Sequence, residues 1–178
     1  MKRRPLLRGA LAPALLAAAT DSARAEEYPA APLRIVGPYA AGGIADVLAR
    51  LVGARLETNW RQPVVVENRP GANGTIALQF VARARPDGYT LLLGNTATQV
   101  VNRHLYRNLP FDLEDGFQPI GLIASTPMLL VVAPSHPANS VAELVAMARA
   151  APGRMNFGSA GNGSASHLEL AMLAREAR

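Results

Sequence analysis

The feature that most constrains the fold is an alternation between short, β-rich apolar runs and segments with helical periodicity. Three apolar runs are each followed by a helical pattern: 33–37 by 44–58, 64–67 by 76–83, and 90–93 by 97–105. Strands that are separated by helices pair in parallel, and the helices then cover the faces of the sheet. The sequence therefore predicts an α/β fold in which three βα units surround a mainly parallel sheet.

The first predicted strand runs through a Gly-Gly turn directly into a helix. The first backbone N–H groups of a helix lack internal partners and carry roughly half a positive charge, so they can hold a carboxylate or a phosphate. Gly42 and Gly43 would let a ligand approach this backbone, with Tyr39 and Ala40 in the same loop. A plain strand-to-helix connection has the same pattern. We interpret the corner as a candidate anion site.

Several spaced motifs resemble, in the same order, those of the Bug-type receptors, which are the extracytoplasmic substrate-binding proteins of tripartite tricarboxylate transporters. The motifs lie at residues 28–29, 33–46, 62–75, 86–95, 109–112, 117–120 and 156–167. The resemblance implies a two-lobed fold like that of type II periplasmic binding proteins, without enzymatic activity. It also implies capture of a small carboxylate between the lobes, delivery to membrane transporter subunits, and a monomeric receptor. The chain departs from the family pattern at Tyr39, Ala41, Asn73 and Ala171.

The resemblance also sets the expected domain organisation. Residues 26–120 would form the first lobe, residues 118–124 the hinge, and residues 121–178 the start of a second lobe. Because family members are longer, we expect the second lobe to be truncated at Arg178. Its predicted elements are strands at 128–132 and 155–157 and helices at 140–150 and from 166 onward, with Ser140 and Glu143 forming a helix cap.

The first 25 residues have the layout of an export signal. Basic residues at 2–4 precede an apolar stretch at 9–19, and Ala23-Arg24-Ala25 is a small-x-small cleavage site, so we expect cleavage after Ala25 and a periplasmic location. The apolar stretch is about half of the roughly 20 residues that span a membrane. Arg3 and Arg4 are also compatible with a twin-arginine signal, so the sequence leaves the export route open.

Charge and cysteine content narrow the functional classes further. Five of the 18 basic residues precede residue 26, so the rest of the chain is close to neutral and a nucleic-acid partner is not expected. The chain has no Cys, which excludes disulfides, thiolate metal sites and a lipidated cysteine. We expect no metal and no cofactor.

Two further loops are candidate ligand contacts. Asn95 and Thr98 directly follow the third predicted strand, where open α/β sheets place ligands, although helix capping by Asn95 or Thr96 would also explain this polar cluster. On the opposite wall, the loop before the last helix repeats the pattern of a glycine-rich helix start. Its candidate residues are Ser159, Ala160, Asn162, Gly163, Ser164 and His167.

Three residues in or beside these loops have alternative roles. Asp46, in the first helical turn, would cap the helix or contact an ammonium or hydroxyl group of a ligand. His167 is expected to orient its loop rather than to contact the ligand. Arg69 could clamp an anion, but we expect a structural arginine that pairs with Glu67.

An enzyme is the alternative class. The best cases are an exported hydrolase or transferase that uses Ser164 with His167, and a phosphate-handling transferase at Gly42-Gly43. The sequence has no G-x-S-x-G elbow, no P-loop lysine and no H-E-x-x-H motif. We therefore predict a binding protein without catalytic residues.

Overall fold

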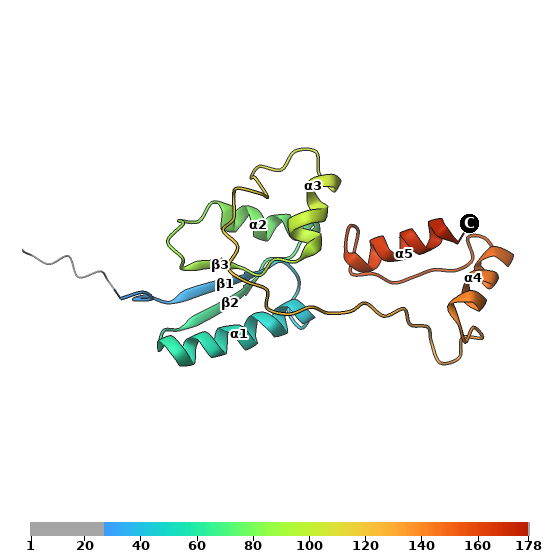
Figure 1. Ribbon diagram of the computed structural model, residues 1–178, viewed down its shortest axis with the longest axis horizontal. Coiled ribbons are helices and arrows are strands. Elements are labelled where there is room, and N and C mark those ends of the chain that lie inside the picture. Colours follow the sequence, from blue (N-terminus) through green and yellow to red (C-terminus); the bar gives the residue numbers. More distant parts are fainter. Residues whose placement is uncertain (1–26, 178) are drawn as a thin grey trace, which may run out of the picture.

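The computed structural model describes residues 27–177. Its first part, residues 33–105, is called the α/β body below (Figure 1). This body consists of β1 (Leu33–Gly37), α1 (Ile44–Trp60), β2 (Val64–Asn68), the 3₁₀ helix η1 (Ala72–Gly74), α2 (Thr75–Ala82), β3 (Thr90–Leu92), the π-helical turn η2 (Ala97–Val101) and α3 (Asn102–Leu105). The second part, called the helical segment, contains α4 (Val141–Ala150) and α5 (Ala165–Glu176).

The sheet confirms the three predicted βα units. All its strands are parallel, in the order β2-β1-β3, and Ile35 of the central strand pairs with Val66 on one side and Leu91 on the other. Helices α1 and α2 lie on opposite faces of the sheet (Figure 1). The α/β fold class is therefore as predicted.

The core of the α/β body lies between the sheet and its helices. Ile35 is buried against Ala49 of α1 and Leu93 at the end of β3. Gly53 lets α1 come close to the sheet, because a Cβ atom at this position would lie 3.3 Å from Val64 Cγ1. This packing holds the start of α1 in a defined position at the end of β1.

The strand order creates a switch point at the carboxyl edge of the sheet. From β1 the chain moves outward to β2, then crosses over to β3 on the other side of β1. The loops after β1 and β3 therefore diverge from neighbouring strands, which is where open α/β sheets bind ligands. Residues 39–43 and 95–98 lie in these two loops.

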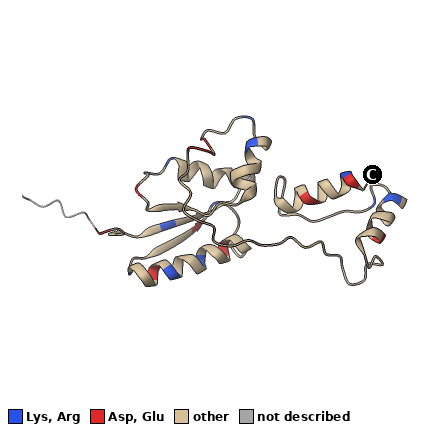
Figure 2. Ribbon diagram, in the orientation of Figure 1, with Lys and Arg blue, Asp and Glu red and all other residues tan. Residues whose placement is uncertain are grey.

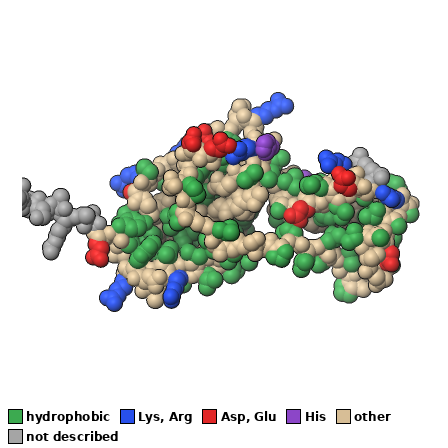
Figure 3. Space-filling view, viewed as in Figure 1, with side chains coloured by type: hydrophobic (Ala, Val, Ile, Leu, Met, Phe, Trp, Pro, Cys, Tyr) green, Lys and Arg blue, Asp and Glu red, His purple; other side chains and the backbone are tan. Residues whose placement is uncertain are grey.

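The predicted strands at 128–132 and 155–157 do not form. The chain has no regular secondary structure there, and neither stretch pairs with another strand among the described residues. A strand is stabilised by ladder hydrogen bonds and by a covered face, and residues 120–135 are exposed. Leu129 and Val131, for example, are 79% and 77% exposed. Figure 3 shows apolar side chains on the surface of this part of the molecule.

Both helices of the helical segment begin at a serine cap. The backbone N–H of Glu143 donates to Ser140 Oγ at 3.2 Å, and Glu143 Oε2 accepts from the N–H of Asn139 at 2.7 Å. This confirms the cap predicted for α4. Ser164 caps α5 in the same way, and α5 begins at Ala165, one residue before the predicted start.

The described surface carries charges of both signs. Arginine and acidic residues both occur along α1 and are spread over the other elements (Figure 2). Among residues 27–177, no helix has the length and apolar character needed to cross a membrane.

Candidate functional site

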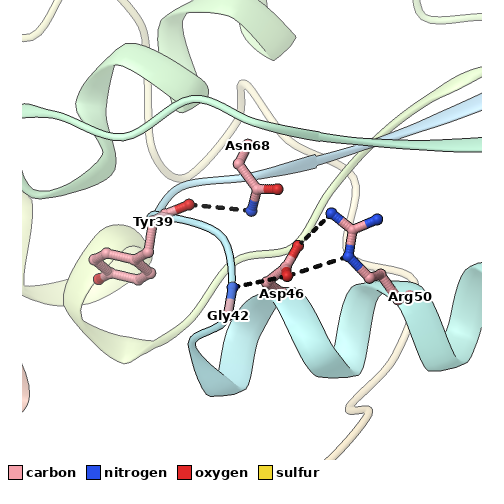
Figure 4. Close-up of polar contacts among 5 residues, drawn as sticks. All are labelled: Tyr39, Gly42, Asp46, Arg50 and Asn68. Carbon is pink, nitrogen blue, oxygen red and sulfur yellow. Dashed lines mark hydrogen bonds and ion pairs between the residues drawn. The ribbon is translucent and has the colours of Figure 1, made fainter.

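The loop between β1 and α1 is closed by Asp46 in the first turn of α1 (Figure 4). Asp46 Oδ2 accepts hydrogen bonds from the backbone N–H of Gly42 at 2.9 Å and from Arg50 Nε at 3.1 Å. On the other side of the loop, Asn68 Nδ2 donates to the carbonyl oxygen of Tyr39 at 3.1 Å. The loop is therefore tied to both α1 and β2.

The carboxylate of Asp46 is held in its charged form. Its pKa is lowered, first by the hydrogen bond from Arg50 and then by the one from the Gly42 N–H, while burial works in the opposite direction. Asp46 is only 5% exposed, and its Oδ1 lies 3.0 Å from Arg50 Nη2. Because the carboxylate of Asp46 is paired with Arg50 and accepts from the Gly42 N–H, the first turn of α1 carries no unpaired negative charge from Asp46.

The amino-terminal end of α1 is open. Its cap residue Gly43 has extended backbone angles, and no side chain caps the helix there. Gly42 has a φ of 85°, which favours glycine, and both glycines are exposed, as is Ala40. Helices α4 and α5, by contrast, are each capped by a serine side chain. The N–H groups at the start of α1 are available to an anion from outside.

The second predicted loop folds on itself. Thr98 Oγ1 accepts from the N–H of Asn95 at 2.9 Å and donates to the Asn95 carbonyl at 3.0 Å, while Asn95 Oδ1 accepts from the N–H of Thr98. Thr98 is fully buried. The Thr98 hydroxyl therefore shapes this turn, and the bond to Asn95 Oδ1 is the one expected if Asn95 caps the helix. Asn95 is exposed, and its Nδ2 lies 3.2 Å from the hydroxyl of Tyr39, which joins the first two loops.

The third predicted loop is also internally bonded. Ser164 Oγ donates to the carbonyl of Gly161 at 2.6 Å and accepts from the N–H of His167 at 3.3 Å. Ser159 Oγ accepts from the N–H of Gly161, and the N–H of Ala160 donates to Ser166 Oγ. Asn162 is exposed in the same loop. These bonds define the loop conformation before α5.

His167 and Ser164 do not form a nucleophile–base pair. His167 Nδ1 accepts from the N–H of Gly163 at 3.3 Å, and its ring stacks on Phe157 with a centroid distance of 6.4 Å. The Ser164 hydroxyl meets the backbone of His167, not its imidazole. The geometry thus matches the loop-orienting role expected for His167 and lends no support to the hydrolase alternative.

Sequence reasoning missed the contact that connects the third loop to the α/β body. Asn73 Nδ2 donates to Asn102 Oδ1 at 2.8 Å and to the carbonyl oxygen of Gly163 at 3.2 Å. The signal available in the sequence was an asparagine in a glycine-rich turn. In the structure Asn73 has a φ of 50°, a conformation that asparagine tolerates. Nothing in the sequence around Asn102 predicts its role, because its burial results from contacts between distant parts of the chain.

Arg69 has the structural role expected from the sequence. Its Nε donates to Glu67 Oε1 at 2.7 Å, and its guanidinium lies 3.6 Å from the ring centroid of Phe80. These contacts occupy the guanidinium within the α/β body. The residues from 27 to 177 contain no group of three or more potential ligands that could hold a metal ion.

An open parallel sheet with glycine-rich loops at its switch point places a candidate ligand site at this edge. Solved structures give the class, which is that of the periplasmic binding proteins. R. palustris Rpa4515, solved with adipate, is 38% identical with a TM-score of 0.77, over 81% of this chain and 48% of that chain. MatC of Rhodopseudomonas palustris, with bound malate, is 32% identical with a TM-score of 0.76, over 84% and 51%.

The family follows from the sequence comparisons. The family model described as tripartite tricarboxylate transporter family receptor matches residues 48–177. A UPF0065 protein of Bordetella pertussis is 42% identical over 97% of this chain and 53% of its own length. Protein BugT of the same organism is 35% identical over 81% of this chain and 44% of its own length. The chain belongs to the tripartite tricarboxylate transporter receptor family, as the motifs indicated.

The relatives also show what kind of family this is and how much of their length the chain covers. The family is one of periplasmic solute-binding receptors and is not an enzyme family. The chain spans about half the length of the curated relatives it matches. The expected export signal and the cleavage after Ala25 lie outside the described residues.

Proposed function

We propose that this protein is an extracytoplasmic receptor that captures a small carboxylate at the open end of α1 and presents it to the membrane subunits of a tripartite tricarboxylate transporter. The observation that carries the proposal is the uncapped α1 terminus, flanked by exposed Gly42 and Gly43. Asp46 supports it, because its charge is paired with Arg50 and does not oppose an incoming anion.

The ligand class is a small dicarboxylate. Two structures that this chain resembles carry adipate and malate. In the proposed site, one carboxylate accepts hydrogen bonds from the first N–H groups of α1, and the exposed amide of Asn95 contacts the ligand beside Tyr39. The loop at 159–164, with Ser159, Ala160, Asn162, Gly163 and Ser164, forms the other wall. A few charge-assisted bonds, less the ordering cost, correspond to about micromolar affinity.

The proposed organisation follows from the same family. Residues 26–120 form the first lobe and residues 121–178 the start of the second, and the extended stretch at 118–124 acts as the hinge. Ligand binds the closed arrangement more tightly and so shifts the population toward it. We further propose that the signal is removed after Ala25 and that the receptor acts as a monomer.

The deciding experiment places a competing carboxylate in the site. In Gly43→Asp, the new side chain is a favourable helix cap, so the fold is retained while the α1 N–H groups are occupied. There is room for it, because a Cβ at Gly43 would lie 3.7 Å from the nearest atom, the Ala40 carbonyl oxygen. Calorimetry with adipate and malate should show at least about tenfold weaker binding.

The matched control is Asn108→Asp, which adds the same charge at an exposed loop residue outside the proposed site and the proposed hinge. It should leave the affinity unchanged. Binding that is equally tight in Gly43→Asp and in the parent would remove the α1 terminus from the site.

A further inference from the structure

We propose that Asn73 and Asn102 are positioning residues, which together with the Gly163 carbonyl form an asparagine bridge that holds the third loop against the α/β body. The bridge joins segments 90 residues apart in the chain. This inference rests on the proposed function, since it assigns the bridge a part in setting how readily the receptor closes on its ligand.

Both hydrogens of the Asn73 amide are used. One is donated to Asn102 Oδ1 within the α/β body, and the other to the Gly163 carbonyl before α5. In return, Asn102 Nδ2 donates to the backbone carbonyl of Asn73 at 3.0 Å. The two asparagines therefore hold each other in one orientation, which leaves the second hydrogen of Asn73 directed at Gly163.

Burial of Asn102 restricts the orientation of the two amide side chains. Asn102 is 0% exposed, so its amide has no water to exchange with and depends on Asn73. Asn73 itself lies in a left-handed turn, with a φ of 50°, that directs the backbone of η1 toward Asn102. The pair is thus prearranged on the α/β body before any contact with the third loop.

The third loop fits closely onto this pair. Gly163 is buried, and a Cβ atom there would come within 2.9 Å of Asn73 Nδ2 and 2.4 Å of Leu105 Cδ1. The adjacent residues 159–162 are exposed, as is the whole stretch 120–135. The contact at Gly163 therefore positions the start of α5, including Ser164 and His167, beside η1 and α3 of the α/β body.

The test measures amide hydrogen exchange of the full chain without ligand. Asn73→Gly removes the side chain and keeps the turn, because glycine readily adopts a positive φ. Exchange at 161–168 should rise about five- to tenfold, the effect of losing one such hydrogen bond, while the peptides that cover β1 and β3 stay unchanged. The control Asn108→Gly, at an exposed loop asparagine, should change neither.

A second variant keeps the side-chain shape. Asn73→Asp replaces the donor with an oxygen that faces two acceptors, so exchange at 161–168 should rise at least as much as in Asn73→Gly. Unchanged exchange at 161–168 in both variants would overturn the bridge. So would an equal rise in β1 and β3, since that would indicate general destabilisation.

Ligand binding is scored separately. The bridge predicts that Asn73→Gly binds adipate or malate about five- to tenfold more weakly than the parent. If the parent binds neither, the proposed function fails, while the exchange result without ligand still decides whether the bridge exists.

Discussion

Asp46 and Arg50 lie one helical turn apart and form an ion pair, in which Asp46 Oδ1 is 3.0 Å from Arg50 Nη2 and Oδ2 accepts from Nε at 3.1 Å. The same Oδ2 accepts from the backbone N–H of Gly42. One carboxylate thus fixes the loop of the candidate site and is neutralised by its own helix. The loop can present backbone N–H groups to an anion without a free acidic group beside them.

The Asp46 pair predicts a specific loss of stability in acid. The folded-state pKa of Asp46 is lowered from its ordinary value of 3.8, so its contribution is fully present above that value and is lost as the pH falls toward the lowered pKa. Asp46→Asn should therefore be less stable than the parent at pH 7, and the difference should shrink below about pH 4. Urea unfolding at several pH values measures it. The exposed helix residue Glu57, changed to Gln, is the control, and an identical pH profile for Asp46→Asn and the parent would contradict the assignment.

Loss of the Ser164 cap should destabilise the first turn of α5. Ser164 Oγ accepts from the N–H of His167, so Ser164→Ala should destabilise the start of α5 by about 1 kcal/mol, the usual cost of losing a serine cap. Hydrogen exchange in the first turn of α5 should be about fivefold faster. Ser159→Ala removes an exposed hydroxyl that accepts from Gly161 but caps no helix. If both variants had the same effect on α5, the capping role would be wrong.

The stacking of Arg69 predicts a measurable coupling with Phe80. The guanidinium lies 3.6 Å from the centroid of the Phe80 ring, close enough for a cation–π interaction of about 0.5–1 kcal/mol at a partly exposed site. A double-mutant cycle with Arg69→Gln and Phe80→Leu, read by urea unfolding, should give a coupling in that range. The same cycle with Arg34→Gln, at 5.7 Å from the same ring, should give less. Carboxylate affinity should not change in Arg69→Gln.

The core predicts which leucines stabilise the α/β body. Leu78 of α2 is 0% exposed, so Leu78→Ala should lower the free energy of unfolding by about 2–5 kcal/mol through lost burial and a residual cavity. Leu51 of α1 is 66% exposed, and Leu51→Ala should cost less than about 0.5 kcal/mol. Chemical unfolding of the full chain compares them, and similar losses at the two positions would place the core elsewhere.

Sequence reasoning predicted much of the fold and part of the candidate site. The helical periodicity of α1, the Ser140 cap and the Glu67–Arg69 pair each depend on residues a few positions apart, and all three are present. The strands expected at 128–132 and 155–157 are absent, because apolar composition favours a strand only where a partner ladder exists. For the loop at 95–98, the sequence left capping by Asn95 or Thr96 and ligand contact open; Asn95 Oδ1 accepts from the N–H of Thr98, and the Thr98 side chain is buried.

The sequence by itself determined the local elements and the open, glycine-lined start of α1, because periodicity, caps and turns are encoded within a few neighbouring residues. Only the tertiary structure decided the strand order β2-β1-β3, the burial of Asn102 and the bond from Asn73 to Gly163. These depend on pairing and packing between residues far apart in the chain. Such contacts form only where the whole fold brings both partners together and removes water from them, and no short stretch of sequence records that.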